Sequence, residues 1–256
     1  MKNVIQLGRA MLLFALVSCS PKMAPQTSSE SKPNESMGAS TASTGGAVIS
    51  AYLATIGGVE KLSKINDIKI TMEGNTAMGS MTMTTMKKNN TMMAMTIESN
   101  GMIFMDQRYN GTKASITSPQ GSEEITDEEA LKNFSRQAVM FPELNYFKEG
   151  YKIELVGTEE VKGQSQQVVK ITTPDGKEIK EFYDPQSHLK IKTEIEAEVQ
   201  GLMRTIVNET SDYREVNGVK IPYSLTISGA MPMALKLEVS DVKINSGLSN
   251  SLFEAN

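Results

Sequence analysis

The sequence predicts a mainly β protein: a curled antiparallel sheet of about ten or eleven strands that forms an incomplete barrel covered by short helices. Three observations lead to this fold class. Apolar and polar residues alternate over several long segments, as in residues 189–199. Short turn motifs separate these segments, and only the beginning and the middle of the domain show helical spacing. Strands joined by tight turns pair as antiparallel neighbours with one dry and one wet face.

The domain is expected to open with a helix in two parts, because apolar residues recur at helical spacing on both sides of a glycine pair. Gly57 and Gly58 should end the first part, since glycine readily adopts the backbone conformation that closes a helix. The apolar residues that define the two parts are Val48, Tyr52 and Ile56, then Val59, Leu62 and Ile65. The first strand should follow, with Ile68, Ile70 and Met72 on one face.

The stretch from residue 72 to residue 105 holds ten of the eighteen methionines of the chain. Two rows of them occur at every second position, which places each row on one face of a strand. Asn89 and Asn90 between the rows form a natural turn, so we expect a hairpin with one face covered in thioether side chains. Methionine adapts to irregular apolar partners, so this face is either ordinary core or the wall of a ligand cavity. The candidate lining residues are Met81, Met83, Met93, Met95 and Ile97.

The middle of the chain is expected to contain a hairpin turn at Asn110-Gly111 and then a helix. Thr126 and Glu129 have the spacing of a capping box, which predicts a helix over residues 127–139. Pro142 can start a second short helix that reaches Phe147. An acidic run suits the positive end of the helix dipole, and we assign to it Glu123, Glu124, Asp127, Glu128 and Glu129.

From Tyr151 onward the sequence returns to strands, with turn motifs at residues 174–176, 184–187 and 217–218. Two of the later strands are expected at residues 219–227 and 233–239. The clearest strand has an apolar face made of Leu189, Ile191, Ile195, Ala197 and Val199, and a predicted solvent face made of Lys190, Lys192, Glu194, Glu196 and Glu198.

The predicted helices are too small to cover the dry face of such a sheet. Strands of near ten residues span about 33 Å at ~3.3 Å per residue. Bare apolar areas of that size are rare on monomers, so the sheet should curl around its helices. A curled sheet with too few helices to fill it leaves an apolar groove or cavity, which is the usual place for a ligand.

The N-terminal residues predict export and a lipid anchor. Residues 1–18 contain a basic start and a short apolar run, which is typical of a signal peptide. Cys19, the single cysteine, follows Leu16, Val17 and Ser18, an arrangement that resembles the lipobox of bacterial lipoproteins. By that resemblance Cys19 carries diacylglycerol and an N-acyl chain such as palmitate. We therefore expect a signal peptide over residues 1–18, the lipidated cysteine and a disordered tether over residues 19–46, and one domain over residues 47–256.

Composition and motifs favour a protein that is not an enzyme. The net charge of −4 gives no basic surface for nucleic acid. No nucleophile elbow, phosphate-binding loop or dinucleotide motif occurs, and no cofactor is expected. The single histidine, His188, fits a turn, so no zinc site of histidine and cysteine is expected. Thioethers bind Cu(I), so a periplasmic copper site made from the methionines stays open as a minor alternative.

Several phrases of the sequence resemble Bacteroidetes-type envelope lipoproteins of the outer-membrane lipoprotein-sorting family, the LolA/LolB-like carriers and receptors. These phrases are the helix Tyr52–Gly58, the turns Asp184–Leu189 and Asn217–Pro222, and the ending Val242–Asn245 followed by Leu252-Phe253. The resemblance implies an eleven-strand incomplete barrel closed by helices over an apolar cavity that receives acyl chains. Neither the arginine of the carriers nor the exposed apolar loop residue of the receptor can be placed on a position of this sequence.

The function predicted from these observations is binding of an acyl chain or another apolar ligand by a lipid-anchored envelope protein. The expected role is in sorting of lipoproteins or lipids to the outer membrane. No acidic cluster follows Cys19, so we expect the periplasmic face of the outer membrane. The alternative is an interaction module that has no catalytic role and assists an envelope peptidase or another envelope protein. The expected partners are thus the membrane, an acyl ligand and a protein of the envelope.

Overall fold

The structure, a computed structural model, describes residues 44–76, 79–199 and 201–255. The predicted signal peptide, Cys19 and nearly all of the predicted tether lie outside the described residues. The first helix, α2 (Gly45–Ile56), begins slightly before residue 47. The Thr44 side chain accepts a hydrogen bond from the Ala47 amide at 3.2 Å and caps this helix. Residues 44–46 therefore belong to the folded domain and not to the tether.

The first half of the fold is a meander that follows the chain. Its strands are β1 (Asp67–Thr76), β2 (Gly79–Lys88), β3 (Met92–Ser99), β4 (Met102–Tyr109), β5 (Ala114–Ser118) and β6 (Gly121–Ile125). The expected methionine hairpin is β2 and β3, which pair from Met81 opposite Ser99 to Lys88 opposite Met92. Asn89 and Asn90 adopt positive φ angles of 53° and 57°, as a tight turn requires.

The second half is another meander with longer strands. They are β7 (Lys152–Val161), β8 (Gln164–Thr172), β9 (Glu178–Tyr183), β10 (Lys190–Val199), β11 (Leu202–Val216), β12 (Val219–Ser228) and β13 (Leu235–Ile244). The two halves meet where β1 pairs with β13, from Ile68 opposite Ile244 to Gly74 opposite Leu237. This is the one strand pairing among the described residues that does not join consecutive strands.

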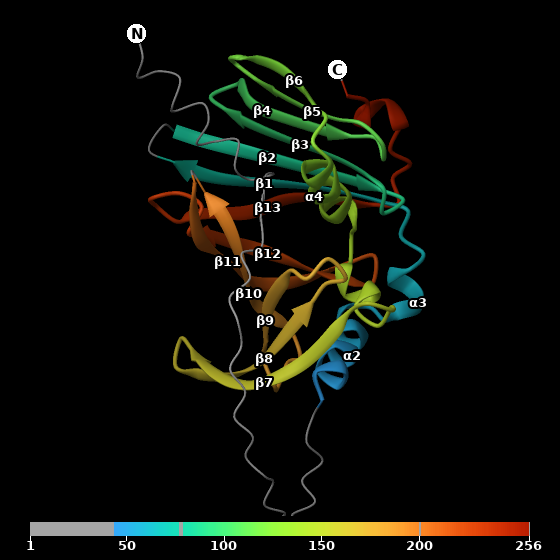
Figure 1. The fold of residues 1–256 in the computed structure, drawn as a ribbon, viewed down its shortest axis with the longest axis vertical. Helices are drawn as coiled ribbons and strands as arrows, with labels where there is room; N and C mark the ends of the chain where they lie inside the picture. Colours follow the sequence, from blue (N-terminus) through green and yellow to red (C-terminus); the bar gives the residue numbers. More distant parts are fainter. Residues whose placement is uncertain (1–43, 77–78, 200, 256) are drawn as a thin grey trace, which may run out of the picture.

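All thirteen strands form one antiparallel sheet that is not closed, with β6 at one edge and β7 at the other. This confirms the predicted fold class, with two strands more than the upper expected count. The sheet curls, and its helices lie on the inside of the curve (Figure 1). Helix α4 (Glu128–Ala138) packs on β3 and β4, whereas α2 packs on β7, β8 and β12. The short α3 (Val59–Leu62) and the 3-10 helix η2 (Pro142–Asn145) complete the inner layer.

Two apolar clusters fill the inside of the curve. The cluster under α4 contains the methionine rows, Tyr109, Phe134 and Leu237. The cluster under α2 contains Tyr52, Leu53, Ile56, Val169, Tyr183 and Ile221. A third, small cluster lies on the opposite face of the methionine hairpin, where Phe253 of η3 (Asn250–Phe253) packs on Met86 and Ala94.

Two details differ from the sequence-based expectations. Glu123 and Glu124 do not start a helix, because they lie in β6, and helix α4 begins after its N-cap Asp127. Strand β6 is an exposed edge strand with only Ile125 buried, so it carries no apolar alternation that could reveal it. Lys190 does not face solvent: the pairing of β10 with β9 shifts by one residue between Lys190 and Lys192, and Lys190 turns inward.

Candidate functional site

A pocket of about 270 Å³ lies on the inside of the curve where the two apolar clusters meet. Its floor is formed by β1, β2 and β12, and its sides by α2, by β10 and β11, and by the segment Met140–Glu143 that follows α4. Most of its lining is apolar, and the polar members are Thr85, Lys87, Glu143, Lys190, Thr210 and Lys220. Such a site, with apolar walls and few polar groups, is typical of a small-molecule pocket.

The predicted lining residues are brought together, but beside this pocket. Met81, Met83, Met93, Met95 and Ile97 are all buried in the cluster under α4, where Phe134 and Ala138 of the helix pack on the same cluster. The neighbouring methionine that does line the pocket is Met72 of β1, which pairs with Met83. In the described structure these side chains are core that borders the pocket, and their contact with a ligand stays a prediction.

One wall of the pocket contains a buried charge cluster that the sequence did not reveal. The Lys190 ammonium of β10 pairs with the Glu143 carboxylate of η2 and, at 2.8 Å, with Glu181 of β9. The Tyr146 and Tyr183 hydroxyls donate hydrogen bonds to Glu181 at 3.1 and 2.5 Å. Both carboxylates are therefore paired with the same cation, and Glu181 also accepts two hydrogen bonds from hydroxyl groups.

The pKa values in this cluster follow from its burial and its two carboxylates. Burial lowers the pKa of Lys190, but Glu143 and Glu181 outweigh that effect and raise it well above the ordinary value. Burial, together with Glu181, raises the pKa of Tyr146 and of Tyr183. Lys190 is therefore a permanent cation at neutral pH, and both tyrosines are permanent hydrogen-bond donors.

Lys87 of β2 is a second lysine in the pocket wall, and it has a different environment. Its ammonium donates a hydrogen bond to the Val139 carbonyl at 2.9 Å, at the C-terminal end of α4, where a cation suits the helix dipole. Among the described residues no carboxylate lies within 4 Å of it. Burial lowers the pKa of Lys87 to about 8, although the charge of Glu143 acts in the opposite direction. The side chain is half-buried and belongs to the lining of the pocket.

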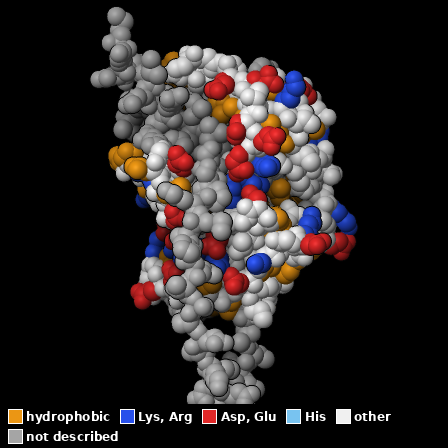
Figure 2. Space-filling model, viewed as in Figure 1, with side chains coloured by type: hydrophobic (Ala, Val, Ile, Leu, Met, Phe, Trp, Pro, Cys, Tyr) orange, Lys and Arg blue, Asp and Glu red, His pale blue; other side chains and the backbone are white. Residues whose placement is uncertain are grey.

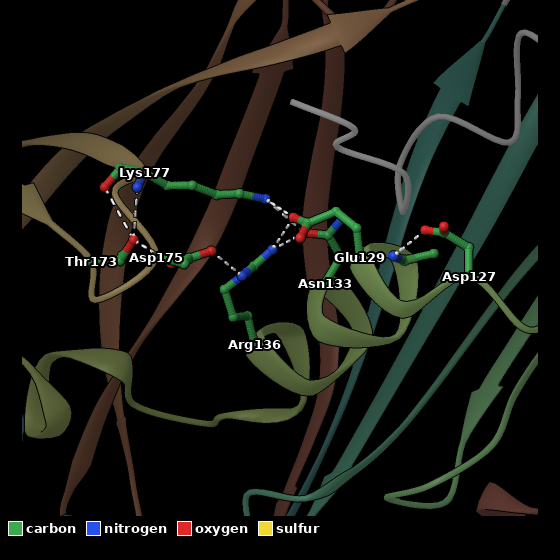
Figure 3. A network of polar contacts seen from close by, with 8 residues as sticks. Asp127, Glu129, Asn133, Arg136, Thr173, Asp175 and Lys177 are labelled. Carbon is green, nitrogen blue, oxygen red and sulfur yellow. Dashed lines mark hydrogen bonds and ion pairs between the residues drawn. The ribbon is translucent and has the colours of Figure 1, made fainter. Parts of the chain in front are cut away.

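A polar bridge crosses the inside of the curve from α4 to the turn between β8 and β9 (Figure 3). Lys177 of the turn contacts Glu129 of the helix at 2.7 Å, and Arg136 of the helix contacts Asp175 of the turn at 2.5 Å. Arg136 also contacts Glu129 at 3.2 Å, so the four charges form a chain. The Lys177 ammonium donates a further hydrogen bond to Asn133 at 3.1 Å. The bridge links the two halves of the sheet at a second place, besides the pairing of β1 with β13.

A row of exposed apolar side chains lies at one end of the sheet, which we call the apolar rim. The connections after β3, β10 and β12 lie at the same end, because neighbouring strands run antiparallel. The most exposed of their side chains are Met102, Leu202 and Met233, at 63%, 59% and 74% of full exposure, and Ile103 and Met203 accompany them. Figure 2 shows hydrophobic side chains at several places on the viewed face of the molecule, including a group at its left edge.

The described residues contain no group of three or more histidine, cysteine, aspartate or glutamate side chains that could hold a metal ion. His188 lies in the turn after β9 with a φ of 57°, and its amide donates to the Asp184 carbonyl at 2.8 Å. The role of His188 in a turn is thus confirmed. In residues 44–255, the described helices include none that is long and apolar enough to cross a membrane.

Comparisons with known proteins found similar proteins among solved structures and not by sequence. No protein-family model and no curated protein matches the sequence. A protein of the DUF1329 family from Desulfovibrio piger aligns with a TM-score of 0.53 and 13% identity, over 81% of this chain and 96% of that one. An outer membrane lipoprotein-sorting protein domain from Vibrio parahaemolyticus aligns with a TM-score of 0.51 and 12% identity, over 80% and 95%. This chain has the fold of a lipoprotein-sorting domain.

A LolA superfamily protein from Nitrosomonas europaea also aligns, with 16% identity over 79% of this chain and 97% of that one, at a TM-score of 0.48. The Vibrio parahaemolyticus domain agrees with the resemblance to the outer-membrane lipoprotein-sorting family that the sequence phrases carried. At 12–13% identity, the first two comparisons establish a shared fold and nothing finer. The residues of the pocket have to be interpreted from their own geometry.

Proposed function

We propose that this chain is a binding protein of the cell envelope, without enzymatic activity, that holds an acyl chain or a similar apolar ligand in the pocket between α2, β1, β12 and the segment after α4. The observation that carries the proposal is the pocket itself, about 270 Å³ with mainly apolar walls on the inside of an open sheet. A lipoprotein-sorting domain with the same fold supports a role with lipids or lipoproteins.

The chemistry of the pocket supports binding more than catalysis. Lys190 and Glu143 in its wall neutralise each other in an ion pair and offer no free nucleophile or base. Among the described residues, Lys87 has no carboxylate within 4 Å that could act with it as a general base. The groups present can orient a ligand, but they form no nucleophile–base pair.

The test is ligand capture by the full chain carrying Cys19→Ser, which removes the predicted lipidation without shortening the chain. Native mass spectrometry should find co-purified lipid, and a neutral fluorescent apolar probe should bind saturably. Ile221→Trp would fill the pocket from its floor and should abolish probe binding, whereas Val156→Trp on exposed β7 should not. A protein that binds no lipid and no probe, or an Ile221→Trp variant that binds as before, would overturn the proposal.

A lipid anchor at Cys19 on the periplasmic face of the outer membrane is part of the same proposal, and it rests on the sequence around that cysteine. Metabolic labelling with an alkyne fatty acid should mark the wild-type protein in the outer-membrane fraction. Cys19→Ala should abolish the label and release the protein from the membrane. Labelling that persists in Cys19→Ala would contradict the anchor and leave the pocket proposal intact.

The apolar rim favours a second candidate function, contact with an envelope partner protein. Its side chains are far more exposed than is usual for large apolar residues, and exposed apolar patches commonly mark interaction sites. Crosslinking from position 233 in intact cells would test this candidate. A specific crosslinked protein that disappears with Met102→Asp and Leu202→Asp would support it, and crosslinks to lipid alone would exclude it.

A further inference from the structure

The charges around the pocket are unbalanced in favour of cations. Three lysines line it, namely Lys87, Lys190 and Lys220, whereas Glu143 is the one carboxylate in the lining. Lys190 is neutralised by Glu143 and by Glu181 behind it. Lys87 and Lys220 have no carboxylate within 4 Å among the described residues. An apolar pocket with an unneutralised ammonium group in its wall is a suitable site for a ligand that is apolar along its length and anionic at one end.

Of the two unneutralised lysines, Lys87 is the one that the structure holds in place. Its bond to the Val139 carbonyl uses one of the three donors of the ammonium, and no other hydrogen bond to it occurs within the described part of the chain. The ammonium of Lys220 has no hydrogen bond there that could fix its position. A fixed cation with unused donors can bind an anion without paying to order the side chain first.

The size of the pocket restricts the apolar part of the ligand. A volume of about 270 Å³ lies just below the usual range of small-molecule sites, which is roughly 300–1,000 Å³. It suits one acyl chain of moderate length and not the several chains of a mature lipoprotein. A ligand that suits both the unneutralised cation and this volume is therefore an amphiphile with a single acyl chain.

We propose that the pocket binds an anionic amphiphile with a single acyl chain, and that the Lys87 ammonium binds its carboxylate or phosphate head group. This proposal rests on the proposed function, since it assigns the class of ligand for the same pocket. Lys87 would hold the head group beside the end of α4, and the chain would lie over Ile68, Ile70 and Met72 toward Leu225.

The proposal includes a dependence on pH. Lys87 is charged at neutral pH and loses its proton as the pH rises through about 8 in the free protein. The other titratable groups that face the pocket are Tyr52, Glu143, Lys190, Tyr213 and Lys220. Burial raises the pKa of Tyr52 and of Tyr213, and Glu143 and Glu181 raise that of Lys190. These three groups therefore keep their charge states where Lys87 changes.

The experiment measures displacement of the neutral probe N-phenyl-1-naphthylamine from the full chain carrying Cys19→Ser. The competitors are laurate, dodecyl phosphate and 1-dodecanol, which share one chain and differ in the head group. At about pH 7 at least one anionic competitor should displace the probe at a concentration about tenfold or more below that of 1-dodecanol. The stronger of the two anions identifies the head group as a carboxylate or a phosphate.

Lys87→Met should reduce this anion preference to less than about threefold and leave displacement by 1-dodecanol unchanged. Lys220→Met is the matched control and should keep the preference, and Lys87→Arg should restore much of it. In the protein without these changes the preference should fall as the pH rises above about 8, so the proposal can be tested even if Lys87→Met folds poorly.

Three outcomes would overturn the proposal. If 1-dodecanol competes as well as both anions, the pocket binds apolar chains without a head-group site, and the proposed function survives alone. If Lys220→Met, and not Lys87→Met, removes the preference, the head group lies elsewhere. If the probe does not bind at all, the proposed function fails together with this inference.

Discussion

The Lys177 ammonium lies 2.7 Å from the Glu129 carboxylate, and this contact joins the turn between β8 and β9 to helix α4. The helix follows β6 at one edge of the sheet, whereas the turn belongs to the strands near the other edge. Both side chains are partly exposed, with 20% and 35% of their surface accessible. The pair therefore holds the helix over the concave face by an interaction that water and salt can weaken.

Removing this pair should loosen α4 more than it destabilises the protein. A double-mutant cycle with Lys177→Met and Glu129→Gln is expected to give a coupling free energy of about 0.5–1 kcal/mol, which falls in high salt. Hydrogen exchange of the α4 amides should become faster in either variant. Lys170→Met is the control, because Lys170 pairs with Glu154 and Glu178 of the sheet and not with the helix. Unchanged exchange in α4 would show that apolar packing alone holds the helix.

The same pair predicts a loss of stability in acid. The hydrogen bond from Lys177 lowers the pKa of Glu129 below 4.5; burial opposes the shift, and Arg136 adds to it. A lowered pKa in the folded state contributes stability above the unfolded pKa, and this contribution is lost as the pH falls through the folded pKa. Denaturant titrations from about pH 6 to about pH 3 should therefore show a smaller loss in Glu129→Gln than in the wild type. Equal losses would mean that other carboxylates determine the acid sensitivity.

Lys190→Met should be among the most destabilising single substitutions in the protein. It leaves the Glu143 and Glu181 carboxylates buried at 3% and 2% exposure without their cation, at a cost of about 3–5 kcal/mol. The triple variant Lys190→Met, Glu143→Gln and Glu181→Gln should recover most of that loss, because no unpaired charge remains. Both are measured by urea denaturation. A loss below about 1 kcal/mol in the single variant would show that water reaches the cluster.

Lys87 predicts a rise of stability in mild alkali. Its pKa is about 8 in the folded protein and about 10.5 when the chain is unfolded, so between these values the unfolded chain binds more protons. The free energy of unfolding should therefore increase with pH across this window, relative to the variant Lys87→Met. The comparison is made below about pH 10, where the tyrosines are still protonated in the unfolded chain. If the free energy of unfolding changed with pH equally in the two proteins, the Lys87 ammonium would be fully hydrated in the folded protein.

Substitutions of Met93 test whether the methionine rows are tightly packed core or an adaptable cavity wall. The Met93 side chain is 2% exposed in the cluster under α4. Met93→Ala should therefore lower the free energy of unfolding by about 2–5 kcal/mol, and Met93→Leu should lower it by less than about 1.5 kcal/mol. Losses well below these values would indicate a loosely packed, cavity-like interior.

The double variant Met93→Leu and Met95→Leu also tests the copper alternative, because unchanged Cu(I) stoichiometry in it would exclude a site made from these thioethers.

Local patterns made much of the fold predictable. The turn at Asn89-Asn90 and the glycine pair after Ile56 each determine the local backbone, so the sequence alone reveals them. The helix near residue 128 was also expected, but its N-cap is Asp127 and not Thr126 of the predicted capping box. The methionine rows alternate cleanly because one face of their hairpin is buried. Strand β6 escaped recognition because an exposed edge strand has no buried face to impose alternation.

The site was much less predictable, because it depends on contacts between distant residues. Lys190 sits in an apparently regular alternation, and only the register shift beside it turns its ammonium toward Glu143, 47 residues earlier in the chain. Lys87 follows the methionine row of β2, and no motif in the sequence marks it. Its burial results from the segment after α4, which no local pattern connects with β2. The methionines attracted attention by their number, whereas the pocket is lined mainly by ordinary aliphatic and aromatic residues.

The pairing of β1 with β13 also determines when the protein can fold. Every other strand pair forms between neighbours in sequence, so each meander can assemble as its residues leave the ribosome. The central pair needs the last strand, and until it forms the buried faces of β1 and β2 remain exposed to water. A chain that stops before Leu235 would lack the strand that pairs the two meanders, and closing this one long loop is the expected slow step of folding.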